Sequence, residues 1–427
     1  MLEKFTNFLE NKLSMPMARL AEQRHLRAVR DGIIATLPLI IVGSFFLIVA
    51  FPPLPESWGV TQYLKANAAT ILLPYRMTMY IMTMYATWGI GYSLAKSYKL
   101  DGVTGGILSA IAFMMTIVPQ AVEGLGWVMP MSNMGGGGMF VGIIVSILAV
   151  EVLRFTTTKN FRIKMPEQVP PSVARSFEAL TPTAIIILLM ATATYFLKFD
   201  WHGVVAKIVD PLVSASDSLP SVLILVFLIT LFWSFGIHGV SIIGSLARPL
   251  WLQLLDQNTA AVAAGQPAVG IASEPFFQWF IWVGGAGATI GLVILMATVC
   301  KSKYGKSLGR TALVPGIFNI NEPAIFGAPI VLNPILIIPF VVTPMILAVL
   351  SWFAMSMDLV SKVTVTAPWT LPGPIGAFLA TGGDWRAVVL NIICIVISLI
   401  VYYPFVKMYD KKLLAEEAAE EALELDA

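Results

Sequence analysis

The sequence predicts an all-α, polytopic membrane protein. Hydrophobic residues make up 57% of the 427-residue chain and charged residues only 12%, with a mean hydropathy of +0.81. Apolar runs of about 20 residues, the length that a helix needs to cross a bilayer, recur along the chain. We expect about ten transmembrane helices, near residues 30–51, 72–95, 103–121, 136–155, 179–198, 219–237, 240–256, 276–300, 332–354 and 385–406.

Two further segments have the pattern of amphipathic helices that lie on a membrane surface. Residues 1–27 place leucine and phenylalanine side chains at helical spacing among lysines and arginines, and residues 203–217 carry a similar apolar stripe. The N-terminal segment lacks the short apolar core and small-residue site of a cleaved signal peptide. A net charge of only +2 suggests no nucleic-acid partner.

Lysine and arginine determine the predicted orientation, because positively charged loops stay on the cytoplasmic side. If all the basic segments are cytoplasmic, five spans precede residue 200 and five follow it, and both termini lie in the cytoplasm. The basic segments are the N-terminus and residues 96–99, 154–175, 301–310 and 407–412.

Two apolar stretches, 312–331 and 358–384, are too rich in proline and glycine to form continuous helices. Broken backbone at membrane depth is tolerated only where it is buried in protein or lines a wet cavity, so we expect two re-entrant hairpins. Broken and polar elements of this kind mark the substrate-binding part of a transporter. We therefore divide the chain into a first half (1–178), a fifth span with a connecting amphipathic helix (179–218), a substrate-binding half (219–410) and a cytoplasmic tail (411–427).

Glu322 is the leading candidate for a functional residue. It stands in Asn321-Glu322-Pro323 among some forty almost wholly apolar residues, so no charge nearby in sequence can neutralise it. An acid inside a membrane is by default part of a substrate or ion site. His238 follows Gly236-Ile237 at the break between two spans. A lone histidine is more often a packing residue, but the glycines on either side favour an accessible ring and a functional role.

Three other residues have two interpretations each. Arg248 lies within a span and needs an acidic partner or a wet cavity, so it either forms a structural ion pair or contacts the substrate. Trp369, in the second hairpin, could stack on the apolar face of a sugar ring, or it could belong to the aromatic belt at the membrane interface. For Trp385 the belt interpretation is favoured.

The remaining polar features are expected to be structural. Glu151 and Arg154 have the i,i+3 spacing of a helical ion pair, and Arg30-Asp31 suits a headgroup boundary. The four glycines at 135–138 indicate close backbone contact, because no Lys-Ser/Thr of a phosphate loop follows them. The two cysteines have no metal or redox spacing, and we expect neither a metal nor a cofactor.

Three motifs give the chain a specific resemblance that covers essentially its whole length. Residues 316–323 read GIFNINEP and are followed by GAPIVLNP, residues 233–239 read WSFGIHG, and residues 164–177 read KMPEQVPPSVARSF. With these motifs the chain resembles the membrane-spanning IIC component of the bacterial phosphoenolpyruvate-dependent phosphotransferase system. Within that system it is most similar to the lactose/cellobiose/N,N'-diacetylchitobiose branch, and there to the diacetylchitobiose transporter.

The resemblance implies a homodimer in the bacterial plasma membrane, with the first half at the dimer interface and the sugar held by the second half. It places Glu322 and His238 at the phosphate-accepting end of a β-linked disaccharide. The phosphate donor would be a phosphocysteine on a separate cytoplasmic IIB protein, so this chain would act as the permease part of a transferase complex. The substrate-binding candidates are Asn321, Trp233, Gly239, Asn319, Trp369 and Arg248.

The expected activity is import of diacetylchitobiose or cellobiose with phosphorylation of the C6 hydroxyl, and the sequence does not decide between the two sugars. One alternative is a proton-coupled secondary transporter, in which Glu322 and His238 would relay a proton. A second is an integral-membrane transferase for lipid-linked sugars, which would need acidic or metal-ligand clusters in a loop. The sequence shows none.

Overall fold

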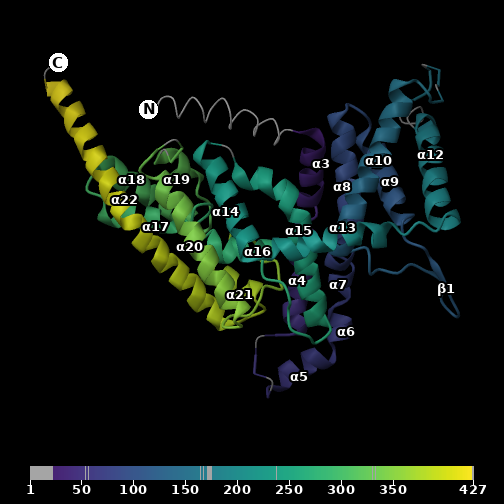
Figure 1. The fold of residues 1–427 in the computed structure, drawn as a ribbon, viewed down its shortest axis with the longest axis horizontal. Coiled ribbons are helices and arrows are strands. Elements are labelled where there is room, and N and C mark those ends of the chain that lie inside the picture. The colour runs from purple at the N-terminus through teal and green to yellow at the C-terminus, as the bar shows by residue number, and fades with distance from the viewer. Residues whose placement is uncertain are drawn as a thin grey trace.

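The computed structural model describes residues 23–425 except residues 53, 56, 164, 167, 171–175, 237, 329 and 332. The amphipathic helix predicted for residues 1–27 falls almost entirely outside the described residues, as does part of the 164–177 motif. The described chain is an elongated and almost wholly helical body (Figure 1). Its one small sheet pairs β1 (Gln120–Val122) with β2 (Gly126–Val128) in antiparallel register.

The helices of the first half and of the fifth span gather at one end of this body (Figure 1). Glycine lets them approach closely, because a Cβ atom on Gly91 of α8 would lie 2.5 Å from the Gly105 carbonyl oxygen of α9. The helices are α3 (Arg24–Ile34), α4 (Leu37–Ala50), α5 (Gly59–Ala66), α6 (Ala68–Ile71), α7 (Leu73–Arg76), η2 (Met79–Ile81), α8 (Met82–Ser97), α9 (Gly102–Met114), η3 (Gly136–Gly138), α10 (Met139–Thr158), α12 (Leu180–Ala191) and η4 (Thr192–Phe196).

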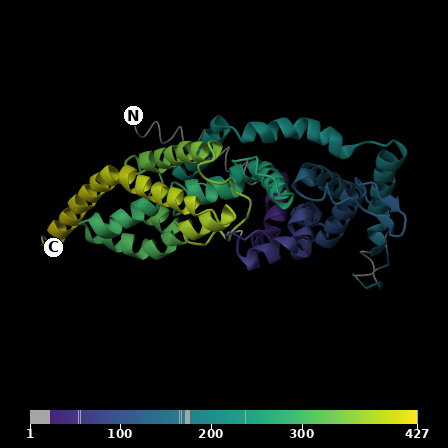
Figure 2. The same ribbon diagram turned by 90° about the horizontal axis from the view of Figure 1, so that it is seen from below.

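The second half forms the other end, and α13 runs along one long edge between the two groups (Figure 2). The axes of α13 and α14 differ by 79°, so the predicted amphipathic helix at 203–217 lies nearly perpendicular to the span that follows it. The helices are α13 (Trp201–Ser216), α14 (Leu219–Ser234), α15 (Gly239–Ala263), α16 (Glu274–Phe276), η5 (Phe277–Ile281), α17 (Ile290–Val299), α18 (Lys303–Ile317), α19 (Glu322–Gly327), α20 (Ile337–Ser356), α21 (Gly373–Ala380) and α22 (Trp385–Leu425).

The prediction of an all-α polytopic membrane protein is confirmed. Among the described residues five helices are long and apolar enough to cross a membrane, or six if the bent pair α13–α14 counts as one span. The other predicted spans contain shorter or broken helices. The stretch at 72–95 is divided among α7, η2 and α8, and the span expected at 103–121 ends at Met114, before the β-hairpin.

The span predicted at 276–300 is the largest correction. Instead of one helix, residues 282–289 form a tight turn between η5 and α17. Gly284, Gly285 and Gly287 have φ angles of 78°, 97° and 80°, which a side chain disfavours, so the Gly-Gly-Ala-Gly sequence ends the helix here. This turn becomes part of the candidate site described below.

Both predicted hairpin regions are broken as expected, with altered bounds. The first begins at Lys303, nine residues before the predicted start at 312, because α18 and α19 pack side by side as its two arms. The second consists of an extended segment, residues 360–368, that leads to the short helix α21. The Gly135–Gly138 stretch also behaves as predicted, since Cβ atoms on Gly135 and Gly136 would lie 2.9 Å from atoms of Asp256.

The acidic tail is helical through residue 425, since it continues α22 without interruption. Near the membrane end of this tail, the buried Asp410 carboxylate accepts hydrogen bonds from Lys301 N at 3.0 Å, Ser302 N at 3.0 Å and Ser302 Oγ at 2.7 Å. Further out, Glu417 accepts from the backbone N–H groups of Lys303 and Tyr304. Helix α22 therefore caps the start of α18.

This cap predicts that Asp410→Asn destabilises the protein. An amide can accept fewer of these bonds, and losing bonds to a charged acceptor costs about 1.5–3 kcal/mol each. We expect a lower apparent melting temperature in detergent solution. Glu416→Gln is the control, because Glu416 is half exposed and makes only a 3.6 Å contact with Lys412. Equal melting temperatures for the two variants would contradict the capping role.

Candidate functional site

Glu322 is the first residue of α19 and is exposed. Proline and a carboxylate are both favoured in the first turn of a helix, so Glu322-Pro323 starts α19 where the hairpin turns back. The Glu322 side chain makes no hydrogen bond or ion pair with any described residue, although it interacts electrostatically with His238. The carboxylate is therefore available to a ligand.

Two asparagines hold the turn that presents Glu322. Asn319 is in the left-handed region, with φ 60°, and its amide accepts from Gly284 N at 3.0 Å. Its Nδ2 donates to the carbonyl oxygens of Trp369 at 3.0 Å and Leu371 at 2.9 Å. One side chain thus joins the first hairpin to the second hairpin and to the 282–289 turn.

Asn321 makes a similar connection. Its Nδ2 donates to Ala286 O at 2.7 Å and to Thr289 Oγ1 at 3.2 Å, while no described residue bonds to its Oδ1. Both asparagines are over 90% buried. The contacts that the structure shows for both asparagines are structural. Contact of either side chain with substrate stays a prediction, and only Asn321 keeps an amide oxygen to which no described residue bonds.

His238 caps the N-terminus of α15. Its Nδ1 accepts the backbone N–H of Ser241 at 3.2 Å, so in the neutral ring the proton is on Nε2, which can donate to a ligand. The ring is exposed and lies 4.5 Å from the Trp233 ring, measured between centroids. Arg30 of α3 also interacts electrostatically with His238. The sequence predicted only an interfacial role for Arg30, which in addition contacts Asp31 at 3.0 Å.

Trp233 and Gly239 flank this histidine. Trp233 is 4% exposed, and its buried Nε1 has no hydrogen-bond partner among the described residues. A buried indole N–H normally has a partner, so this donor could serve a ligand. Gly239 lets α15 begin close to α14, because a Cβ atom there would lie 2.1 Å from the Ile229 carbonyl oxygen. The role that the structure shows for Gly239 is close packing of α15 against α14.

Of the two interpretations of Arg248, the structure shows the ion pair. Its guanidinium holds Glu274, with Nε 3.1 Å from both carboxylate oxygens and Nη2 2.5 Å from Oε1. Sequence reasoning missed Glu274, although Ser273-Glu274-Pro275 repeats the acid-proline helix start of Asn321-Glu322-Pro323.

Glu274 and Trp369 line one cavity, which we call the inner cavity. Trp369 is half exposed there, on the extended segment that Asn319 holds. The cavity lies between α4, α15, the start of η5 and the second hairpin, and its other lining residues include Leu37, Ile40, Ile41, Gln278 and Ala367. Trp385 does not line it and is 68% exposed at the start of α22.

Two other predictions concern charged groups away from these residues. The ion pair between Glu151 and Arg154 is confirmed, with 3.0 Å between Oε2 and Nη1, and Tyr98 also donates to Glu151. Among the described residues, no group of three His, Cys, Asp or Glu side chains could hold a metal ion. The candidate site offers a carboxylate at Glu322 that has no partner among the described residues and that interacts electrostatically with the His238 imidazole.

Comparisons with known proteins agree on one family. The family model for "Phosphotransferase system, EIIC" matches residues 30–344. The lichenan permease IIC component of Bacillus subtilis (strain 168) is 38% identical over 97% of this chain and 96% of the relative. The cellobiose-specific EIIC component of Geobacillus stearothermophilus is 38% identical over 98% of this chain and 97% of the relative.

A solved structure has nearly the same fold. The transporter ChbC, the IIC component from the N,N'-diacetylchitobiose-specific phosphotransferase system, aligns with a TM-score of 0.89 at 38% identity. The alignment covers 96% of this chain and 99% of that one.

The contacts of Asn319 generate a stability prediction. Asn319→Gly keeps the freedom to adopt a positive φ but loses three hydrogen bonds, which should cost about 2–4 kcal/mol in total. Asn319→Ala should cost more, because a Cβ atom disfavours the left-handed conformation. Thermal unfolding in detergent measures both, with Asn67→Ala as the control at an exposed residue that donates one bond to Tyr63 O. Unchanged melting temperatures would show that the two hairpins are held together elsewhere.

Proposed function

Because this chain belongs to the EIIC family of the phosphotransferase system, we propose that it is the membrane subunit that imports a β-linked disaccharide. A separate IIB protein would phosphorylate the sugar on its C6 hydroxyl as it reaches the cytoplasm. The observation that carries this proposal is the exposed Glu322 carboxylate, which has no partner among the described residues and lies within electrostatic reach of His238.

Glu322 acts as the general base in this proposal. The carboxylate takes the proton of the C6 hydroxyl while the hydroxyl oxygen forms a bond to phosphorus, and the phosphorus–sulfur bond of the donor phosphocysteine breaks. The thiolate leaves on the IIB protein, and the sugar phosphate is released into the cytoplasm. The rate depends on positioning, which explains why the Glu322 turn is held so firmly by Asn319 and Asn321.

His238 orients the acceptor hydroxyl. Its Nδ1 is occupied by Ser241, so Nε2–H faces the ligand and can donate to the sugar oxygen or to Glu322. Arg30 adds positive charge close to His238, where the transferred phosphoryl group would bring negative charge. The Trp233 ring packs against the imidazole at an interplanar angle of 48° and limits where the imidazole can move.

Residues that line the inner cavity supply the contacts for the rest of the sugar, and this cavity, about 60 Å³ in the structure, widens to admit a disaccharide. The Trp369 ring offers an apolar face for a pyranose, and Glu274, which Arg248 holds in place, offers acceptor oxygens to hydroxyls. Asn321 contributes its Oδ1, to which no described residue bonds, while Asn319 shapes the site through its side-chain bonds to backbone and Gly239 through close helix packing. The names of the relatives support cellobiose or N,N'-diacetylchitobiose as the sugar.

The remaining parts of the proposal concern the whole molecule. The first half (1–178) forms a homodimer, and the second half (219–410) moves as a rigid body that carries the sugar across the membrane. Both termini and the start of α18 face the cytoplasm, as the positions of lysine and arginine predict. Phosphorylation traps the sugar, so no coupling ion is required.

The deciding experiment supplies membranes that contain this protein with labelled cellobiose or diacetylchitobiose, with and without a phosphorylated IIB protein. We expect sugar 6-phosphate only when the donor is present, and the better substrate then identifies the specificity. Free sugar that accumulates under a pH gradient without the donor would instead make the protein a proton-coupled transporter.

Glu322→Gln should separate binding from chemistry. The amide still forms hydrogen bonds, so we expect the dissociation constant for sugar, measured by calorimetry, to stay within about tenfold, or about 1.4 kcal/mol. Phosphotransfer should fall by about a hundredfold or more, because the amide cannot accept the proton. Glu123→Gln, in the exposed β-hairpin, is the control. Complete loss of binding would make Glu322 a recognition residue instead.

His238→Ala should impair both sugar binding and phosphotransfer, because the imidazole contacts the hydroxyl before and during the reaction. We expect a loss of about tenfold or more in turnover. His238→Gln, which keeps a donor, should restore part of the binding. Turnover equal to that of the unmodified protein would mean that His238 is only a packing residue and a helix cap.

A further inference from the structure

A second cavity lies away from Glu322, and we call it the outer cavity. It has a volume of about 300 Å³ and opens where α4 and α15 end, beside the beginning of α22. Its lining residues come from the end of α4, from α15, from the loop at 267–268, from the segment 358–365, from residues 381–382 after α21 and from the start of α22. In Figure 1, α21 and α5 lie toward the lower edge of the molecule, whereas the C-terminus lies at its upper edge. With the orientation proposed above, the lower edge faces the outside of the cell.

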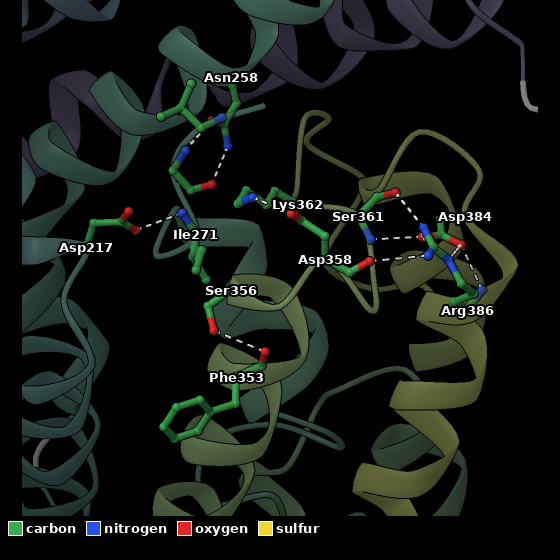
Figure 3. A network of polar contacts seen from close by, with 12 residues as sticks. Asp217, Asn258, Ile271, Phe353, Ser356, Asp358, Ser361, Lys362, Asp384 and Arg386 are labelled. Atoms are coloured by element: carbon green, nitrogen blue, oxygen red, sulfur yellow. Dashed lines mark hydrogen bonds and ion pairs between the residues drawn. The ribbon is translucent and has the colours of Figure 1, made fainter. Parts of the chain in front are cut away.

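The polar side of the outer cavity is a fixed group of charges (Figure 3). The Asp384 carboxylate holds the Arg386 guanidinium, with 3.0 Å between Oδ1 and Nε, and also accepts from Ser361 N at 2.8 Å. Arg386 donates further to Asp358 O at 3.3 Å. Lys362 Nζ lies 2.9 Å from Asp358 Oδ1, and its side chain is only 17% exposed. Donors are thus held in place before any ligand arrives.

The opposite side of the outer cavity is apolar. Leu47, Ile48 and Phe51 of α4 form it, together with Val262 of α15. An aromatic and aliphatic wall that faces a few positioned donors is typical of a site for a neutral, hydroxyl-rich molecule. An oligosaccharide has both an apolar ring face and many acceptor oxygens, so its chemistry fits this cavity.

The outer and inner cavities follow one seam between α4 and the segment 358–369. Thr364 and Val365 line the outer cavity, whereas the next residues, Thr366 and Ala367, line the inner one. On α4, Ile40 and Ile41 line the inner cavity and Leu47 and Ile48 the outer one, about 10 Å further along the helix axis. A sugar in the outer cavity is therefore about two helical turns from the inner one.

A buried piece of backbone closes the seam between the cavities. Val363 and Val365 are completely buried, and α15 fixes the carbonyl oxygens beside them. Asn258 Nδ2 donates to Val363 O at 2.8 Å, and Thr259 Oγ1 donates to Thr364 O at 3.1 Å. The N–H groups of Thr364 and Val365 both donate to Ala380 O of α21. The two cavities share no lining residue, so this barrier separates them.

From this arrangement we propose that the outer cavity is a loading site, where a neutral oligosaccharide binds from outside before the 363–367 barrier moves. Arg386 and Lys362 hold its hydroxyls, and Phe51 covers its apolar face. This loading site rests on the function proposed above, because only import of sugar from outside gives the outer cavity a role in loading. It is distinct from the site at Glu322.

The test uses a reporter cysteine in the outer cavity. Both native cysteines are buried, so Cys300→Ala and Cys394→Ala give a background without reactive thiols. Ala268→Cys then places one thiol in the lining, and Leu125→Cys, at a 75% exposed residue in the β-hairpin, is the matched control. Right-side-out vesicles are labelled with a membrane-impermeant maleimide, with and without cellobiose or diacetylchitobiose. Glu322→Gln is included so that no sugar is phosphorylated.

We expect sugar at about ten times its dissociation constant to slow labelling of Ala268→Cys by about tenfold and to leave Leu125→Cys unaffected. Arg386→Gln, added to Ala268→Cys, should remove most of this protection. Equal labelling rates with and without sugar would overturn the proposal, as would protection that Arg386→Gln leaves intact.

A second measurement tests the loading site separately from the proposed transport and phosphorylation. Ala268→Cys in a background with native Glu322, once labelled with a bulky maleimide, should no longer take up external sugar. In inside-out membranes, where sugar reaches the cytoplasmic mouth directly, it should still be phosphorylated by the IIB donor. If uptake survives labelling, the loading site is wrong, and if phosphorylation is absent even without labelling, the proposed function is wrong.

Discussion

Backbone groups freed by broken helices must find partners inside the protein, because the lipid interior offers none. This constraint governs the whole second half, where spans and hairpins are interrupted at the 282–289 turn and at the extended segment 360–368. Asparagine side chains satisfy much of it. Asn258 bonds to Val269, Gly270 and Val363, and Asn319 bonds to Gly284, Trp369 and Leu371. An amide suits this task because it donates and accepts without carrying a charge.

The hydrogen bonds of Asn319 and Asn321 also hold the turn that presents Glu322. The two hairpins meet at Asn319, and Asn321 ties the same turn to the start of α17. Glu322 follows directly and is left with no partner among the described residues, whereas Glu274, at an equivalent acid-proline helix start, is fully engaged by Arg248. The contrast between the two carboxylates supports the reactive role proposed for Glu322, whereas the contacts of Glu274 are structural.

The two cavities give the proposed transport path a direction. The outer one has fixed donors at Arg386 and Lys362, and the inner one has Trp369 and Glu274. Between them, backbone at 363–365 is held by hydrogen bonds to α15 and α21, each individually weak enough to exchange. Movement of that segment relative to α4 would join the cavities without unfolding either half.

The sequence alone determined the membrane class, several of the spans, the amphipathic helix at 203–217 and the broken hairpins, and it made Glu322 the leading candidate for a functional residue. These properties depend on hydropathy, on proline and glycine, and on one isolated carboxylate, all of which are local. Only the tertiary structure decided that Arg248 pairs with Glu274, that Arg30 lies near His238, that the 282–289 turn receives Asn319, and that Asp410 caps α18. Each of these depends on residues distant in sequence, and local patterns do not specify which distant side chain satisfies a broken backbone or a buried charge.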